Sequence, residues 1–537
     1  MAPSSEEQRH KEQPSENMTS TEKQFEDREG PSNLPTGTRL LAIIVSILLA
    51  MFLVALDRTI IATAVPKIST QFNALDDISW YASAYLLTSC ATQLSWGKIY
   101  TFYRTKTVFL IAILIFEAGS ALCGAAPNSN AFIVGRAIAG AGSAGIFSGA
   151  TVIITQIVPL AKRPIYIGMM GSIFGISSII GPLMGGAFTD NVTWRWCFYI
   201  NLPIGGFTMV VLFLFLTVPH TAKPCTWKQH FLRLDPLGSV LFLPSVICFL
   251  LALQWGGNEY PWNNGRMIAL FVVSGILMIA FVAVQIWLKK DATVPPHVFA
   301  QRSIISGVIF SMLVGGGLIS MLYTLPLWFQ GVRGTTAVKS GIDTIPMVIA
   351  LVVGSILAGG IITATGYYTP WMFVAAILMS TGAGLMTTFK RDTYHAAWIG
   401  YQVLFGIGIG TGMQQPSMAA QTVLRKDEVP IGVSLMFFAQ SFGGAVFISV
   451  AQSLFQNYLR ANLPHVQGID VGKVLAAGAT GLSTAVPTIK LPEVLVLYND
   501  GLRRSFIVTV AVSCLMVLPA LTMEWRTVKR NKSSESA

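Results

Sequence analysis

Three charged residues lie inside long apolar runs of this sequence. Arg136 lies in VGRAIAGAGSAG, Asp57 in LDRTIIATAVP and Glu117 in LIFEAGSALCG. A charge in the middle of a membrane costs at least about 2.5–3.5 kcal/mol and must face a partner or water. We therefore expect Arg136 to lie beside Asp57 or Glu117.

Such a group of charges has two possible roles. Burial raises the pKa of a carboxyl group, whereas a nearby guanidinium lowers it. A pair whose separation changes with conformation is therefore a proton switch, and we predict proton coupling through Asp57, Glu117 and Arg136. The alternative is a static ion pair that holds two helices together. The rarity of charge inside the apolar runs favours the switch.

A second stretch, GMMGSIFGISSIIGPLMGGAFTD, combines closely spaced glycines with a proline. The spacings of Gly171 to Gly175 and of Gly181 to Gly185 allow helices to approach closely. Pro182 removes a backbone donor and bends a helix. General packing of small residues is the alternative to a functional hinge.

Other kinds of site chemistry are missing from the sequence. The six cysteines and six histidines have no disulfide or zinc spacing. There is no phosphate-binding GxxxxGK[ST] loop, and no nucleophile or cofactor motif is present. We therefore predict no enzyme activity, no bound metal and no cofactor.

The composition is that of a membrane protein. Hydrophobic residues make up 53% of the 537 residues and charged residues 11%, against about 25% charged in soluble proteins. Uncharged runs near the bilayer-spanning length of about 20 residues recur along the chain. We predict an all-α polytopic protein with fourteen transmembrane helices, near 40–56, 78–96, 107–126, 131–154, 165–188, 198–218, 237–255, 267–288, 304–329, 344–365, 371–389, 396–416, 429–455 and 506–523.

The distribution of basic residues predicts the orientation. An even number of spans puts both termini on one side, and loops rich in Lys and Arg mark the cytoplasm. The positions that we assign there include Lys98, Arg104, Lys106, Lys162, Arg163, Lys223, Lys228, Lys289, Lys290, Arg425 and Lys426. Residues 1–39, polar and without a signal peptide, are expected to be a disordered cytoplasmic tail, and 524–537 a second tail. The net charge of +11 thus reflects topology rather than nucleic-acid binding.

The spans divide into six, two and six. We expect an N-terminal bundle over 40–218, two linker helices over 237–288 and a C-terminal bundle over 304–523 with a long outer loop at 456–505. Gly97 and Gly360 are expected to form turns that end the second and tenth spans, which is one sign of duplication. A duplicated unit predicts a central cavity and alternating access.

Five motifs in order resemble one known family. LDRTIIATAVP, FIVGRAIAGAGSAG and GPLMGGAFTD are similar to the first-, fourth- and fifth-helix motifs of the drug:proton antiporters of the major facilitator superfamily. WRWCFYINLPIGG (194–206) and QQPSMAAQTVL (414–424) resemble segments of its fungal fourteen-span branch. In pattern the chain is similar to mycotoxin efflux pumps of the aflatoxin, gliotoxin and HC-toxin type, over about residues 40–525.

The resemblance implies roles for particular residues. Asp57 and Arg136 would belong to proton coupling, and a hinge would comprise Gly181, Pro182, Gly185 and Gly186. The family's cytoplasmic loop G-x-L-A-D-R-x-G-R-K is GKIYTFYRTK here, with Thr101 and Phe102 in place of the Asp and Arg. This departure removes the usual charged latch and leaves Gly97, Arg104 and Lys106.

Two further predictions concern the substrate cavity and the outer surface. The second half of the chain has almost no charge within its apolar runs, so we expect an apolar cavity with amide donors from Gln402, Gln414, Gln415 and Gln440. Asn191 begins a glycosylation triplet, but its short loop close to the membrane argues against occupancy.

Together these features predict a proton-driven exporter of a hydrophobic fungal metabolite, mycotoxin or drug, with a role in multidrug resistance. Its expected partners are the substrate, protons and the lipid bilayer, with no nucleic acid, and it is expected to be a monomer in the plasma membrane. A siderophore or vacuolar amino-acid transporter of the same fold, in the vacuolar membrane, is the nearest alternative. A non-transporting membrane sensor is the alternative from another class.

Overall fold

The computed structural model describes residues 35–74, 77–217, 233–257, 260–466, 468–479, 481–482 and 486–529. The expected tails up to residue 34 and from residue 530, and the loop residues Lys223 and Lys228, lie outside this part of the chain. Over the described residues the secondary structure is helical, with isolated bridges and no strand. Helices satisfy their backbone polar groups internally, as a lipid environment requires.

The first half of the chain forms two groups of helices. They are α2 (Gly37–Phe72), α3 (Ile78–Phe102), α4 (Thr105–Ala125), α5 (Ser129–Ile157), α6 (Arg163–Asn191), α7 (Trp196–Tyr199) and α8 (Asn201–Phe215), followed by α10 (Pro236–Trp255) and α11 (Gly265–Leu288). The members of the first group pack mainly on one another. Helices α10 and α11 form a pair that lies against α3.

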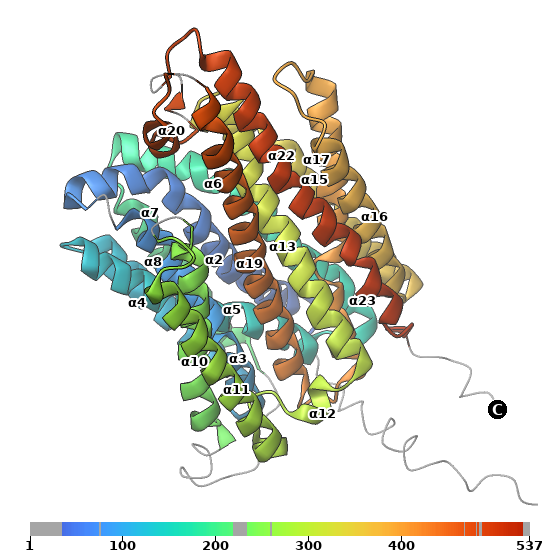
Figure 1. Ribbon diagram of the computed structural model, residues 1–537. Coiled ribbons are helices and arrows are strands. Elements are labelled where there is room, and N and C mark those ends of the chain that lie inside the picture. Colours follow the sequence, from blue (N-terminus) through green and yellow to red (C-terminus); the bar gives the residue numbers. More distant parts are fainter. Residues whose placement is uncertain are drawn as a thin grey trace, which may run out of the picture.

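The second half forms another bundle. It comprises α12 (Pro296–Phe299), α13 (Arg302–Gly331), α14 (Ala337–Asp343), α15 (Ile345–Thr365), α16 (Thr369–Met386), α17 (His395–Gly412), α18 (Gln415–Val423), α19 (Val429–Asn462), α20 (Val471–Ala477), α22 (Leu491–Leu515) and α23 (Val517–Thr522). Contacts between the halves run mainly from α6 to α15 and from α3 and α5 to α19. Figure 1 shows the early helices in blue and cyan and the late helices in yellow to red.

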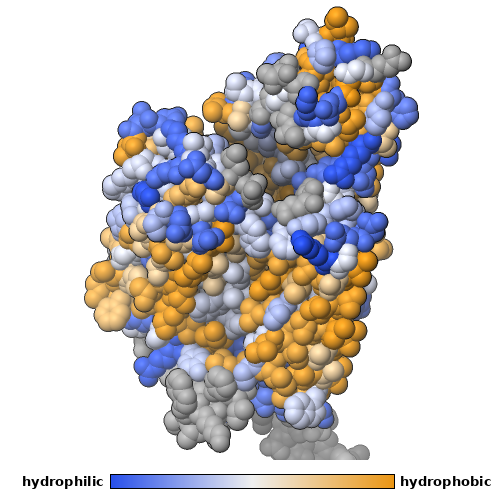
Figure 2. Space-filling model, turned by 60° about the vertical axis from the view of Figure 1, so that its left-hand side comes forward, coloured by the Kyte–Doolittle hydropathy of each residue, from blue (hydrophilic) through white to orange (hydrophobic). Residues whose placement is uncertain are grey.

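Helix α20 lies at one end of the bundle and α12 at the opposite end, as Figure 1 shows. These are called the α20 end and the α12 end. Figure 2 shows apolar surface around the middle of the molecule and polar surface near its ends. The same view shows a hollow at the α20 end, between the two halves. The molecule is therefore open between its halves at the α20 end.

Twelve helical segments in the described part of the chain are long and apolar enough to cross a membrane. The expected number was fourteen. The two long helices outside the twelve are α3 and α17, which lie at the second and twelfth expected spans. Both contain polar side chains buried against other helices, such as Gln93 and Gln402, and these lower the apolar content.

The structure corrects three sequence-based boundaries. Gly97 and Gly360 do not form turns, since α3 continues to Phe102 and α15 to Thr365. The turn after α15 is at Gly366, whose φ of +92° favours glycine. The expected loop 456–505 is largely helical, because α19 runs to Asn462 and α22 starts at Leu491.

The first half of α22 was predicted to be a loop because it contains polar residues. In its first half, Asn499 donates to Phe389 O (3.0 Å) and accepts from Trp328 Nε1 (2.9 Å). Packing of the helix thus satisfies a polar group that looked like part of a loop.

Candidate functional site

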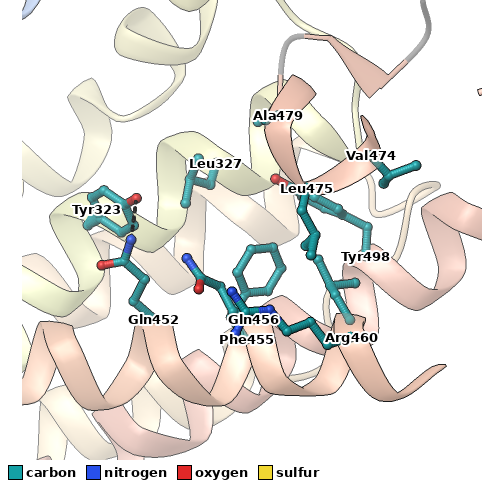
Figure 3. A pocket seen from close by; sticks show the side chains of 12 residues that line it. Tyr323, Leu327, Gln452, Phe455, Gln456, Arg460, Val474, Leu475, Ala479 and Tyr498 are labelled. Atoms are coloured by element: carbon teal, nitrogen blue, oxygen red, sulfur yellow. Dashed lines mark hydrogen bonds between the residues drawn. The ribbon is translucent and has the colours of Figure 1, made fainter. Parts of the chain in front are cut away.

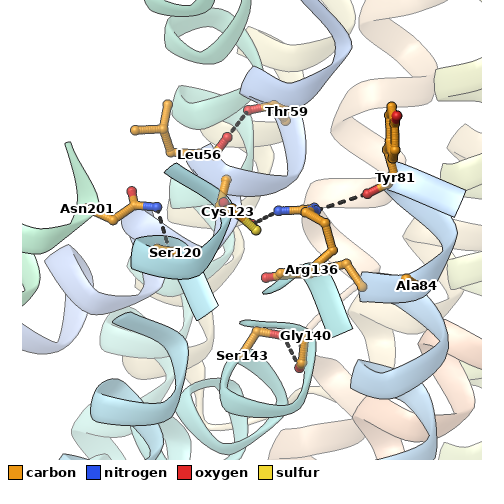
Figure 4. Close-up of polar contacts among 12 residues, drawn as sticks. Leu56, Thr59, Tyr81, Ala84, Ser120, Cys123, Arg136, Gly140, Ser143 and Asn201 are labelled. Carbon is orange, nitrogen blue, oxygen red and sulfur yellow. Dashed lines mark hydrogen bonds and ion pairs between the residues drawn. The ribbon is translucent and has the colours of Figure 1, made fainter. Parts of the chain in front are cut away.

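Arg136 and Asp57 form an ion pair in the interior of the N-terminal half. Arg136 Nη1 lies 2.5 Å from Asp57 Oδ2, and each side chain is 1% exposed. Arg136 Nε also donates to the carbonyl oxygen of Tyr81 (2.9 Å), and its guanidinium lies 4.4 Å from the ring centre of Tyr85. Figure 4 shows Arg136 extending from its helix toward Tyr81. The arrangement joins α2, α3 and α5 through one guanidinium.

Small residues around Arg136 make this burial possible. A Cβ at Gly135 would lie 2.7 Å from Cys123 Sγ on α4, and one at Gly140 would overlap Tyr85 O on α3. Thr88 Oγ1 also donates across to Ala137 O (2.8 Å). Because α3 and α4 approach α5 so closely, the long Arg136 side chain is enclosed between helices.

Glu117 is buried but does not join the ion pair. Its side chain is 6% exposed, and neither carboxylate oxygen has a hydrogen-bond partner among the described residues. A Cβ at Gly205 of α8 would overlap Glu117 Oε1, so the α8 backbone covers the carboxyl group. One turn away, Asn201 Nδ2 donates to Ser120 Oγ (3.1 Å). Of the two carboxylates predicted from sequence, only Asp57 contacts Arg136.

The predicted hinge glycines lie where α6 crosses α2. A Cβ at Gly181 would overlap Thr59 Oγ1, and one at Gly185 would overlap Thr63 Oγ1. Thr59 Oγ1 donates to Ser177 O (3.0 Å), one turn before Pro182. Gly186 differs, since a Cβ there would meet nothing within 4 Å. Helix α6 remains continuous through Pro182.

The halves of the molecule meet closely at the α12 end. A Cβ at Gly97 would lie 2.7 Å from the Ser434 side chain of α19, so Gly97 permits a contact between helices. Ser434 Oγ donates to Ser148 Oγ of α5 (2.9 Å), and Gln93 Nε2 donates to the same Ser148 Oγ (2.5 Å). This hydrogen-bonded group closes the α12 end on one side.

A second contact between the halves involves α6 and α15. Ser355 Oγ donates to Gly168 O (3.0 Å), and a Cβ at Gly359 would lie 2.6 Å from Pro164 O. The glycines again allow backbone to approach backbone. Helix α5 therefore contacts α19, and α6 contacts α15, near the α12 end. At the α20 end, Figure 2 shows a hollow between the halves.

Lys98 was assigned to a cytoplasmic loop, but it is 1% exposed and lies within α3. It donates to Asp291 O (2.9 Å) and to Ala292 O, in the connection between α11 and α13. The same connection is held by Asp235, whose carboxylate accepts from the backbone and hydroxyl of Thr293. A lysine that donates to carbonyl groups thus lies in the motif GKIYTFYRTK, in which the family's usual Asp and Arg are missing.

The other two latch candidates have smaller roles. Lys106 donates to Phe213 O at the end of α8 (2.6 Å). Arg104 occupies the N-cap position of α4, and its carbonyl accepts from Val108 N (3.0 Å). Both residues connect or begin helices within the N-terminal half.

The four glutamines do not line one cavity. Gln402 donates to Asp343 O (3.0 Å) and Gln415 to Thr411 O (2.7 Å), so both bind backbone groups. Gln414 lies near the crossing of α6 and α15, where its side chain would meet a Cβ at Gly171. Gln440 is half-buried on α19. Gln414 and Gln415 line the same narrow space between α6 and α15, and a cavity role for the four glutamines stays a prediction.

Asn191 is the last residue of α6 and is exposed, with Nδ2 bonded to Ala187 O (3.0 Å). The position is thus accessible but directly adjoins a membrane helix.

Sequence reasoning missed the partners that come from other helices. Tyr81 contributes a backbone carbonyl, which no sequence motif reports. Ser148 and Ser434 are 286 positions apart, and neither stands out by type.

Comparison with known proteins decides the family. The profile of the Major Facilitator Superfamily matches residues 47–448. The chain belongs to this superfamily. Its members transport solutes, so the chain is a membrane transporter and not an enzyme.

Several curated relatives are similar over nearly the whole chain. The rubrofusarin-specific efflux pump aurT of Gibberella zeae is 56% identical, over 93% of this chain and 92% of its own length. The efflux pump aflT of Aspergillus parasiticus is 50% identical, over 93% of this chain and 98% of its own length.

A solved structure supports the fold alone. The human organic anion transporter MFSD10 has a TM-score of 0.58 at 13% identity, covering 91% of this chain and all of that one. The superfamily fold predicted from the motifs is therefore confirmed.

Proposed function

We propose that this protein is a proton-coupled exporter that moves a small hydrophobic metabolite out of the cell. The observation that carries the proposal is the fully buried pair of Asp57 and Arg136, in a bundle whose halves meet at the α12 end and separate at the α20 end. The printed names of the relatives support the direction of transport and a metabolite as substrate.

Protonation of Asp57 is the step that we assign to coupling. A proton on Asp57 would leave Arg136 as a buried cation without its counter-charge, and removing one partner of a buried pair costs about 3–5 kcal/mol. The helices that carry the two residues, α2 and α5, would then rearrange until the guanidinium finds another environment. Glu117 contacts no cation among the described residues, so its protonation would not release Arg136.

The proton gradient is sufficient as an energy source, and we propose no cofactor. One proton that enters down about 100 mV supplies about 2.3 kcal/mol, and one pH unit adds about 1.4 kcal/mol. For a neutral substrate this sum supports a gradient of several hundredfold, since about 1.4 kcal/mol is a factor of ten.

We further propose fourteen membrane crossings in a six-two-six arrangement. Twelve are the apolar segments described above, and the other two are α3 and the combined α17 and α18. The α12 end, which carries basic residues such as Lys162 and Lys289, would face the cytoplasm together with both termini. We place the protein in the plasma membrane as a monomer.

A basic amino acid is a poor candidate substrate. Such a ligand needs a buried acid, and in the described part of the C-terminal half the buried acid is Asp343, which is paired with Lys339 at 2.9 Å. The scarcity of unpaired buried acids in the described C-terminal half favours an uncharged or weakly acidic molecule.

The test is gradient-driven export from vesicles loaded with rubrofusarin or lipophilic dyes. We expect Asp57→Asn and Arg136→Ala to abolish export that the intact protein performs. Asp190→Asn is the matched control, because Asp190 pairs with Lys67 on the surface and is 72% exposed. Absence of gradient-dependent export from the intact protein, or normal export by both variants, would refute the proposal.

A further inference from the structure

A cavity of about 300 Å³ lies at the α20 end, apart from the buried ion pair. Helices α13, α19 and α22 form its walls and α20 its roof. Figure 3 shows Tyr323, Gln452, Phe455, Gln456, Arg460 and Tyr498 around it. Its volume is at the lower limit of pockets that bind small organic molecules.

One face of α19 supplies most of the polar lining. Gln452, Phe455, Gln456 and Arg460 recur at spacings of three and four residues, which places their side chains on the same side of a helix. Figure 3 shows these side chains directed toward the region below α20. The helix thus presents two amides and a guanidinium beside an aromatic ring.

The remaining walls are aromatic and aliphatic. The rings of Phe455 and Tyr498 meet edge to face, with centres 5.0 Å apart. Tyr323 is 41% exposed, and its hydroxyl lies 3.5 Å from Gln452 Nε2. Val474 and Leu475 of α20 form an apolar cover. A flat ring inserted here would contact aromatic edges and apolar side chains.

Among the described residues that line the cavity, the charged side chain is that of Arg460. Arg460 Nη2 donates to Gly257 O (3.0 Å), and among the described residues no carboxylate oxygen lies within the 4.0 Å of an ion pair. Within the part of the chain that the structure describes, the guanidinium therefore has a backbone partner but no counter-charge. An acidic group on a ligand would supply one through a charge-assisted hydrogen bond.

We propose that this cavity is a second binding site, on the exit side of the transport path, for planar aromatic molecules that carry a phenol. The ring would lie against Phe455 and Tyr498, and the phenolic oxygen would accept from Arg460. The exit-side assignment rests on the proposed export function, whereas the binding chemistry rests on the cavity itself.

The experiment measures equilibrium binding of umbelliferone, a fluorescent two-ring phenol, to the purified full chain in lipid nanodiscs. Its methyl ether, herniarin, is the matched ligand without an acidic group. We expect saturable binding of umbelliferone and weaker binding of herniarin. Arg460→Gln is expected to weaken umbelliferone binding by about tenfold, which corresponds to about 1.4 kcal/mol, and to leave herniarin binding nearly unchanged.

Arg504→Gln is the control variant, because Arg504 is also exposed on an outer helix segment but stacks on Tyr458 outside the cavity. It should bind both ligands like the intact protein. Equal affinity for the two ligands, or intact binding by Arg460→Gln, would overturn the proposal. Unchanged elution and thermal stability show that each variant is folded.

Failure of the site and failure of the export function are distinguishable. Binding is measured without a proton gradient, so Asp57→Asn should bind umbelliferone normally even if it exports nothing. Export without umbelliferone binding would refute the site alone. Binding without any gradient-driven export would refute the exporter and leave a ligand site on a protein of another function.

Discussion

At the scale of single residues, the decisive feature is that two buried carboxylates have different surroundings. Asp57 contacts a guanidinium, whereas Glu117 is covered by the α8 backbone and, in the described part of the chain, contacts no cation. From the sequence alone, both are carboxylates within apolar runs, and either could be the partner of Arg136. The difference in partners is the reason why we propose Asp57 as the proton-coupling carboxylate.

We expect Glu117→Gln to retain gradient-driven export, because glutamine has nearly the same shape and Arg136 keeps its partner. The measurement compares gradient-driven export from vesicles that contain Glu117→Gln with export from vesicles that contain Asp57→Asn. Loss of export in Glu117→Gln with normal export in Asp57→Asn would move the proton site to Glu117.

Arg136→Lys tests the geometry of the guanidinium. Arg136 reaches Asp57 and Tyr81 O with two different nitrogens of its guanidinium. Lysine has a single terminal nitrogen and cannot reproduce both contacts with the same geometry. Loss of one hydrogen bond to a charged group costs about 1.5–3 kcal/mol. We expect a lower thermal stability and slower export, and wild-type values for both would contradict the role of the Tyr81 contact.

At the scale of helices, glycines set how closely neighbours approach. The crossing of α6 on α2 depends on Gly181 and Gly185, whereas Gly186 faces open space. The three glycines look alike in the motif GPLMGGAFTD, and only the packing separates them.

We therefore predict that Gly181→Ala destabilises the protein by about 1–3 kcal/mol, the usual range for an overpacked contact. The added methyl group overlaps Thr59 Oγ1, which must move from its bond to Ser177 O. Gly186→Ala is the matched control and should be neutral. Thermal unfolding in detergent measures both, and equal stabilities would show that the crossing is not tight.

At the scale of the whole molecule, hydrogen bonds join the two halves at the α12 end, whereas Figure 2 shows a hollow between them at the α20 end. The contacts of Ser148 with Ser434 and of Gly168 with Ser355 close the α12 end, and Lys98 fixes the connection that follows α11. Alternating access requires these contacts to open while the α20 end closes.

A cross-link between Ser148→Cys and Ser434→Cys tests this requirement. Their hydroxyl oxygens lie 2.9 Å apart, so the paired cysteines should form a disulfide in a background without native cysteines. We expect oxidation to stop export and a reductant to restore it. Each single cysteine variant is the control, and continued export by the oxidised double variant would contradict rocking of the halves.

The sequence by itself determined the membrane class, the superfamily and the central charged residues. The membrane class and the charged residues follow from local composition, namely apolar runs of spanning length and rare charges within them. The superfamily follows from the resemblance of short motifs to a known family, and such motifs are likewise properties of neighbouring residues. The identity of Arg136 as a buried cation belongs to this group.

Only the tertiary structure decided which groups meet. Asp57 rather than Glu117 pairs with Arg136, Lys98 binds carbonyl groups instead of water, and Gly97 lies under Ser434 instead of in a turn. Each of these contacts joins helices that are distant in the sequence. Their partners are backbone carbonyls, hydroxyls or the space beside a glycine, which carry no signal in the residue order, because the way the helices cross sets them.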